Sequence, residues 1–192
     1  MAAVELDKDG RPHRVRFDAI DDLKGATLAA WAKSALHPTV HLVTDGLASF
    51  AAAGARVAAH GAIIVSPHKS SELEPFRWVN TFIANAKTAI RGTYHHFDFD
   101  KYRHRYLAEA QYRVNRRFDL RALVGRLAHA CARTAPCPEK WLRLAKVSVL
   151  LTAGVNASVG FIVVCMASLK VTVTGCPGAC LRALVSASCA VR

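Results

Sequence analysis

Short apolar runs alternate with amphipathic stretches through the first half of the chain, and this alternation limits the fold more than any other feature. The opening stretch predicts a β-hairpin, because the β-like pieces AVEL and HRVRF flank the turn dipeptide Asp9-Gly10. Two later apolar runs of strand length are residues 39–44 and 62–65. Helical periodicity is found in residues 23–36, 47–53, 76–91, 101–117 and 120–134. Strands that alternate with helices predict an α/β fold.

Basic residues are concentrated in one part of the sequence. The 192 residues carry a formal net charge of +12. Residues 77–134 hold twelve Lys or Arg against four Asp or Glu, a net charge of +8, whereas residues 1–76 have a net charge of −1. So concentrated a positive charge attracts polyanions, which makes a nucleic acid or an anionic membrane surface the first partner to consider. The candidate DNA-binding residues are Arg91, Arg103, Arg113, Arg116 and Arg117.

Residues 147–192 form a tail of different composition, rich in Ala, Val, Ser and Leu and without Asp or Glu. Its first 23 residues carry no charge and could span a bilayer by length, but polar residues and glycines dilute them, so a membrane partner is disfavoured. The spacing of Cys176 and Cys180 has no second ligand pair to complete a zinc site. We therefore expect the tail to pack poorly and to be dispensable.

Asp45 is the first candidate site residue. It follows the apolar run 39–44 and precedes Gly46. The carboxyl ends of strands in an open α/β sheet are where ligands and metals bind, and a carboxylate there is a hard-oxygen ligand for Mg²⁺. A plain turn, or a cap on the helix that follows, is the alternative explanation of the same residue.

The helix predicted over residues 76–91 supplies two more candidates. Asn80 lies 35 positions after Asp45, and Lys87 follows seven residues later, which is two helical turns and therefore the same face. Arg91 extends this line, whereas the opposite side is apolar. A polar stripe on an amphipathic helix often means only a solvated face.

The block WVNTFIANAKTAIRGTYHHF, followed by RYLAEAQYRVNRRFDLRALVGRL, resembles the ISXO2-like branch of bacterial DDE transposases, and HLVTDGLASF resembles the segment around the second Asp of that family. The resemblance covers about residues 3–145. It implies an RNase H-like fold and divalent-metal-dependent DNA strand cleavage and transfer, with Mg²⁺ as cofactor and transposon ends as partner. Asp45 would be a catalytic metal ligand, Asn80 would replace the third acid, and Lys87 would contact phosphate.

One element of the resembled fold is missing. An RNase H-like core begins with three antiparallel strands, and the first carries the first catalytic Asp, but here a single hairpin precedes the first helix. Asp7 is a weak substitute, because it lies in the hairpin turn. We expect a transposase fragment that lacks its N-terminal part, whose sheet has an exposed edge beside the hairpin. Whether such a chain is an enzyme stays open.

These inferences divide the chain into an incomplete RNase H-like core over residues 1–97, a helical part over residues 98–146 and the tail over residues 147–192. The chain is expected in the cytoplasm, because no secretory signal opens it. A non-catalytic basic DNA-binding module is the alternative function, and a small membrane-associated protein is a third. A second copy of the chain is a further partner to consider.

Overall fold

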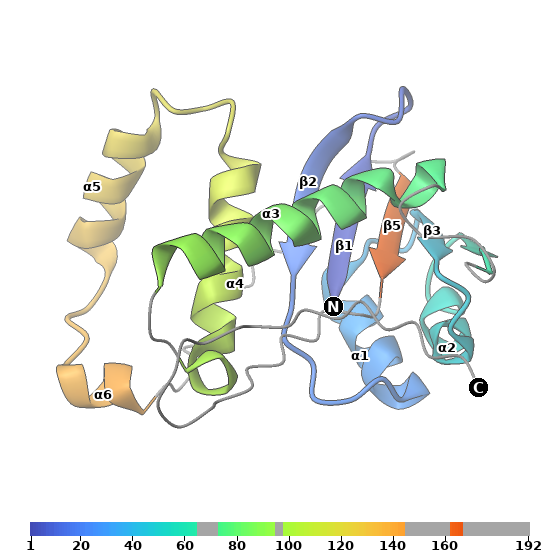
Figure 1. Cartoon of the computed structure of the whole chain (residues 1–192), viewed down its shortest axis with the longest axis horizontal. Coiled ribbons are helices and arrows are strands. Elements are labelled where there is room, and N and C mark those ends of the chain that lie inside the picture. The colour runs from blue at the N-terminus through green and yellow to red at the C-terminus, as the bar shows by residue number, and fades with distance from the viewer. Residues whose placement is uncertain (65–72, 95–97, 145–161, 167–192) are drawn as a thin grey trace.

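The centre of the molecule is a five-stranded mixed sheet (Figure 1). It is seen in a computed structural model that describes residues 1–64, 73–94, 98–144 and 162–166. In their order across the sheet, the strands are β2 (Pro12–Phe17), β1 (Ala2–Leu6), β5 (Ile162–Met166), β3 (His41–Thr44) and β4 (Ala59–Ala62). Strand β1 is antiparallel to β2 and to β5, whereas β3 is parallel to β5 and to β4. The mixed α/β class agrees with the sequence prediction.

Helices cover both faces of this sheet. One set is α1 (Gly25–Ala35), the 3₁₀ turn η1 (Ala48–Phe50) and α2 (Ala51–Gly54). The other is the 3₁₀ turn η2 (Glu74–Phe76), α3 (Arg77–Thr93) and α4 (Phe99–Asn115). Two further helices are α5 (Leu123–Arg133) and α6 (Glu139–Arg143), which lie to the left of the sheet in Figure 1. None of the described helices is long and apolar enough to cross a membrane.

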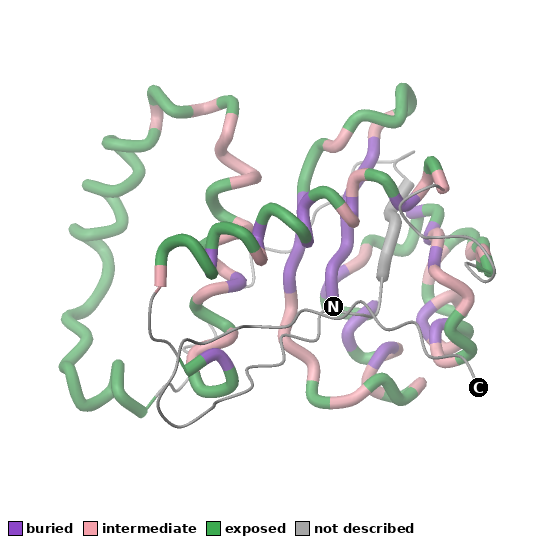
Figure 2. The backbone as a smooth tube through the Cα atoms, in the orientation of Figure 1, coloured by how far each residue is buried: buried purple, intermediate pink, exposed green. Residues whose placement is uncertain are grey.

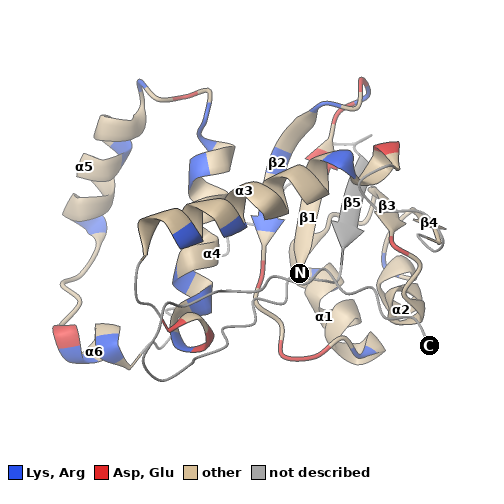
Figure 3. Ribbon diagram, viewed as in Figure 1, with Lys and Arg blue, Asp and Glu red and all other residues tan. Residues whose placement is uncertain are grey.

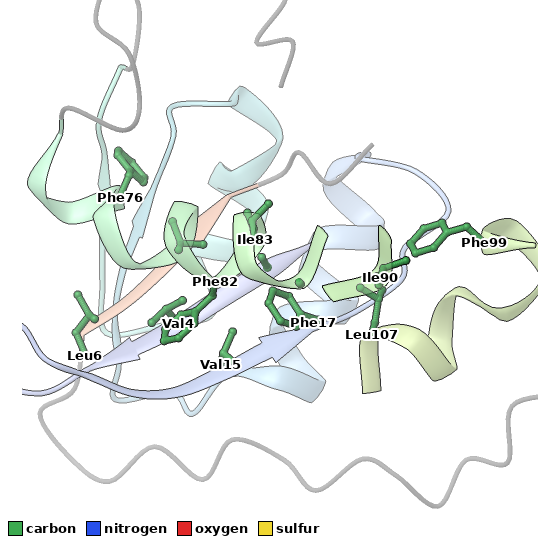
Figure 4. Close-up of a cluster of buried hydrophobic side chains, with 13 residues drawn as sticks. Val4, Leu6, Val15, Phe17, Phe76, Phe82, Ile83, Ile90, Phe99 and Leu107 are labelled. Carbon is green, nitrogen blue, oxygen red and sulfur yellow. The ribbon is translucent and has the colours of Figure 1, made fainter. Parts of the chain in front are cut away.

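The alternation of side chains along β1 separates two hydrophobic clusters. Val4 and Leu6 belong to the cluster under α3 and α4, which also contains Phe17 and Phe82 (Figure 4). Ala3, one position out of phase, belongs to the cluster under α1. Because successive residues of a strand point to opposite faces, one short apolar strand contributes to both clusters.

The end of α4 is fastened to strand β2 by side-chain amides. Asn115 accepts a hydrogen bond from the Val15 N–H at 2.8 Å and donates one to the Val15 carbonyl at 2.9 Å. Gln111 accepts one from the Phe17 N–H at 2.9 Å. The outer edge of β2 is therefore satisfied by a helix instead of another strand, which protects it from pairing with other chains.

Most predicted elements are confirmed, but the strand predicted at residues 62–65 is displaced. The structure has β4 at Ala59–Ala62, and the pairing continues only to the Ile63 N–H, which donates to the Thr44 carbonyl at 2.9 Å. Residues 59, 61 and 62 are exposed, as suits an edge strand, so apolar character did not mark its position. Backbone pairing with β3 decides where this strand lies.

The expected open edge beside the hairpin is also corrected. Strand β5 pairs with β1 on one side and with β3 on the other, so β1 is an interior strand of the sheet. Residues 162–166 come from the tail that we expected to pack poorly. The other residues of the tail, including most of the candidate membrane segment and the Cys176–Cys180 pair, lie outside the described residues.

Candidate functional site

Asp45 lies directly after β3, as the sequence predicts, and its Oδ1 atom is buried. Gly46 has a φ of +80°, a left-handed conformation that a glycine adopts without cost. A Cβ at this position would also come within 3.3 Å of the Ile63 carbonyl oxygen. The backbone after β3 thus strongly favours glycine at position 46, and the Asp45 carboxylate lies at the carboxyl end of the strand.

The alternative in which Asp45 caps the following helix does not agree with the structure. The residue before η1 is Leu47, and no side chain caps that turn. The left-handed conformation of Gly46 and a ligand role of Asp45 are compatible, because one depends on the backbone and the other on the Asp45 side chain.

Sequence analysis did not find the polar pair beside Asp45. Thr44 is fully buried at the end of β3, and its Oγ1 lies 2.9 Å from His60 Nε2 on β4. The pair links two neighbouring parallel strands next to the Asp45 turn. No local signal could have found it, because His60 lies 16 positions further along and the predicted strand began after it.

Helix α3 places Asn80 in its first turn and Lys87 two turns later. Its start is tied to the hairpin turn, because the indole N–H of Trp78 donates to the Gly10 carbonyl at 3.0 Å. From there α3 runs along the hairpin strands, away from the hairpin turn. Figure 4 shows this course, because Leu6 and Val4 lie near Phe82, whereas Phe17 lies nearer to Ile90.

The strand register puts Asp45 toward the other end of the sheet. Thr44 is level with Cys165 on β5, which is level with Ala3 on β1, whereas the hairpin turn follows Leu6. The described contacts therefore do not by themselves bring Asn80 to Asp45, and the convergence of these two side chains stays a prediction.

Two cations stand one turn apart on α3. Lys87 is half-buried and Arg91 is exposed. Burial lowers the pKa of the Lys87 ammonium, and the positive charge of Arg91 lowers it further. Like charges at this spacing destabilise a helix slightly, and a bound anion removes that penalty. A phosphate contact of Lys87 and Arg91 stays a prediction.

Three of the predicted DNA-binding arginines have partners within the protein, either one helical turn away or far away in the sequence. Arg103 pairs with Asp21 at 2.6 Å, and Arg113 pairs with Glu109 at 3.2 Å. Arg117 donates to the Pro12 carbonyl at 2.6 Å and to the Val114 carbonyl at 2.8 Å, and burial lowers the pKa of its guanidinium. Arg117 thus connects the end of α4 to β2, which is a structural role that the sequence did not indicate.

Arg116 lies 6.0 Å from the centre of the Tyr112 ring and is partly exposed. Figure 3 shows Lys and Arg on α3, α4 and α5, with few Asp or Glu near them. Most of the basic residues in the segment 77–134 thus lie on these three helices.

The residues present fit a two-metal centre poorly. Within the described part of the chain, no three His, Cys, Asp or Glu residues are grouped so that they could hold a metal ion. Asp7, the substitute acid considered above, instead accepts hydrogen bonds from the N–H groups of Asp9 and Arg11 at 2.9 and 2.7 Å. Asp7 thus holds the hairpin turn together, and among the acidic residues named as site candidates this leaves Asp45.

A mixed sheet with helices on both faces and a carboxylate directly after one strand describes an α/β protein that is compatible with part of a DDE-transposase domain. Residues 1–115, more than half of the chain, match the family model of the ISXO2-like transposase domain. The chain therefore belongs to the ISXO2-like transposase family. DNA transposition is the activity of this family, and a divalent metal is its cofactor. No curated protein and no solved structure matches the chain.

Proposed function

We propose that this chain binds DNA through its basic helices and does not by itself cleave or transfer DNA strands. The observation that carries the proposal is the sequence of β5, the strand between β1 and β3. The first catalytic Asp of the resembled fold belongs to a strand beside the hairpin, and the strand found there reads IVVCM, without a carboxylate.

Charge balance supports the loss of strand transfer. Two Mg²⁺ ions bring four positive charges into one small site, and they hold the attacking and leaving oxygens about 3.5–4 Å apart. Asp45 supplies one negative charge, whereas Asn80 offers a carbonyl oxygen without charge. Mg²⁺ sheds its water reluctantly and demands octahedral oxygen geometry, so a site with one carboxylate holds it weakly.

DNA binding needs none of these ligands. In this proposal Lys87 and Arg91 contact the phosphate backbone, and Arg116 adds to the same surface, whereas Arg103, Arg113 and Arg117 act mainly through their partners within the protein. Counterions released from the DNA make such binding sensitive to salt, with a slope of about 0.9 per phosphate contact.

The test measures DNA affinity by fluorescence anisotropy at several salt concentrations, with Mg²⁺ and with a chelator. We expect the same DNA affinity with Mg²⁺ as with the chelator, and a steep linear fall of log K with the logarithm of the salt concentration. Arg91→Ala should reduce the slope by about 0.9. Arg143→Ala is the matched control on α6, outside the basic region, and should leave the slope unchanged. An unchanged slope for Arg91→Ala would remove this residue from the interface.

A strand-transfer assay with Mg²⁺ or Mn²⁺ and transposon-end DNA tests the other half of the proposal. No product is expected. Transfer that is present in the wild type and lost in Asp45→Ala would show that the site is complete, and it would make Asp45, Asn80 and Lys87 the catalytic residues that the resemblance implies.

A further inference from the structure

The position between β1 and β3 requires a strand of defined direction. Its occupant must run antiparallel to β1 and parallel to β3, as β5 does. Val164 is level with Val4 on one side and with Val43 on the other, so the register is continuous across three strands. The position is the middle one of the five strands, and its neighbours contribute to both hydrophobic clusters, Val4 on β1 to one and Leu42 on β3 to the other.

An empty position would be costly for the fold. Both β1 and β3 would turn a row of unpaired N–H and C=O groups toward the gap, in the middle of a sheet that helices cover on both faces. Backbone pairing does not depend on where the occupant comes from in the sequence. A short apolar β-branched run is sufficient, because such residues favour strands and a strand buried on both faces needs no polar alternation.

The occupant comes from outside the part of the chain that the family model matches. The match ends at residue 115, whereas β5 begins at Ile162. The pieces of the family domain that surround the position, β1 and β3, are both inside the match. The sheet is thus completed by a segment that does not belong to the matched domain.

We propose that the position between β1 and β3 is a strand-acceptor site whose ligand is an extended apolar segment, and that residues 162–166 of the same chain occupy it. In this arrangement the tail segment takes the sheet position beside the hairpin, where the resembled fold has the strand with its first catalytic Asp, but it brings no carboxylate to that position. This inference is independent of DNA binding, because it concerns how the sheet is completed.

Disulfide trapping in the full chain tests the site directly. Ala3 is opposite Cys165 in the antiparallel pair, where Cα atoms are about 4.5–5.5 Å apart, within the range that a disulfide bridges. The variant is Ala3→Cys in a background with the other cysteines changed to Ser: Cys131, Cys137, Cys176, Cys180 and Cys189. Mild oxidation should give a monomer that migrates faster on a non-reducing gel, and the matched control with Cys165→Ser should not.

The outcomes separate the possibilities. Absence of a link between positions 3 and 165 would overturn the assignment of β5 to this site. A disulfide-linked dimer would contradict the assignment of the strand to the same chain, because residues 162–166 would then come from a second copy.

A proline scan in the full chain provides the second measurement. Val164→Pro removes a ladder N–H from a central strand, a position that does not tolerate proline. The variant should lose its cooperative melting transition, or the midpoint of that transition should fall by more than 10 °C. For a chain of this size such a shift means roughly 3 kcal/mol or more. Val185→Pro makes the same change 19 residues beyond β5 and should melt as the wild type does. Equal melting of both variants would contradict the proposal.

Discussion

Helices α3 and α5 have similarly amphipathic sequences, but within the described part of the chain α3 packs against the sheet and α5 has no buried residue. Five residues of α3 are buried: Val79, Phe82, Ile83, Ala86 and Ile90. In α5 no residue is buried, and Val124 and Leu127 are 76% and 63% exposed (Figure 2). An apolar stripe therefore indicates that a helix can form, whereas its contribution to stability depends on a partner face.

The largest expected difference between the two helices is in the cost of losing one apolar side chain. Phe82→Ala should lower the free energy of unfolding by about 3–5 kcal/mol, because it leaves a cavity between α3 and the sheet. Leu127→Ala on α5 should change it by less than about 0.5 kcal/mol. Urea denaturation of both variants measures the contrast. A cost above 2 kcal/mol for Leu127→Ala would show that α5 packs against another surface in solution.

A second variant tests where the packed helices end and the exposed helix α5 begins. Asn115 ends α4 and exchanges two hydrogen bonds with Val15. Asn115→Ala leaves a part-buried backbone N–H and carbonyl without these partners and should cost about 1–3 kcal/mol in unfolding free energy.

The control for Asn115→Ala is His104→Ala, on the exposed side of the same helix, which should leave the unfolding free energy within about 0.5 kcal/mol of the wild type. If the two variants unfold at the same urea concentration, α4 is not fastened to β2 in solution, and the packed part ends earlier in the chain.

The smallest expected effect concerns a carboxyl inside the packed part. Glu5 on β1 is 4% exposed, and its Oε2 atom has no hydrogen-bond partner among the described residues. Burial raises the pKa of this carboxyl, whereas His13 and Arg14 lower it by less. Because the folded state holds the proton more tightly than the unfolded state, the stabilisation is present at low pH and is lost as pH rises through the folded pKa.

Glu5→Gln removes this dependence. Above the ordinary glutamate pKa of 4.5, the variant should become progressively more stable than the wild type, by about 2–4 °C in melting temperature at pH 7.5, which is roughly 1 kcal/mol for a chain of this size. Melting curves at pH 4, 5.5 and 7.5 measure the gap. Glu139→Gln on the exposed helix α6 is the matched control, and its melting temperature should stay equal to that of the wild type at all three pH values. If the difference in melting temperature between Glu5→Gln and the wild type were the same at every pH, the pH sensitivity would lie in another group.

Much of the fold followed from local patterns. The hairpin at Asp9-Gly10, the strand before Asp45 and the amphipathic helix that carries Asn80 are all found close to where the sequence placed them. Each depends on interactions between residues a few positions apart, which periodicity and turn chemistry report. Strand β4 was misplaced because its exposed residues carry no apolar signal.

The candidate site was less predictable than the fold. The position of Asp45 at a strand end follows from its own neighbours, but its nearest polar pair, Thr44 and His60, depends on how β3 and β4 align. The same holds for Arg117, a predicted DNA contact that also donates a hydrogen bond to the carbonyl of Pro12, 105 positions away. Contacts across such separations leave no local trace in the sequence.

The sequence by itself determined the family, the basic helical region and the kind of element at most positions, because these depend on residue type and spacing. The tertiary structure decided which segment completes the sheet. Nothing in IVVCM distinguishes a central strand from any other apolar run in the tail. The two neighbours β1 and β3 make that choice, because their backbone groups require a partner and accept one from any part of the chain that can reach them.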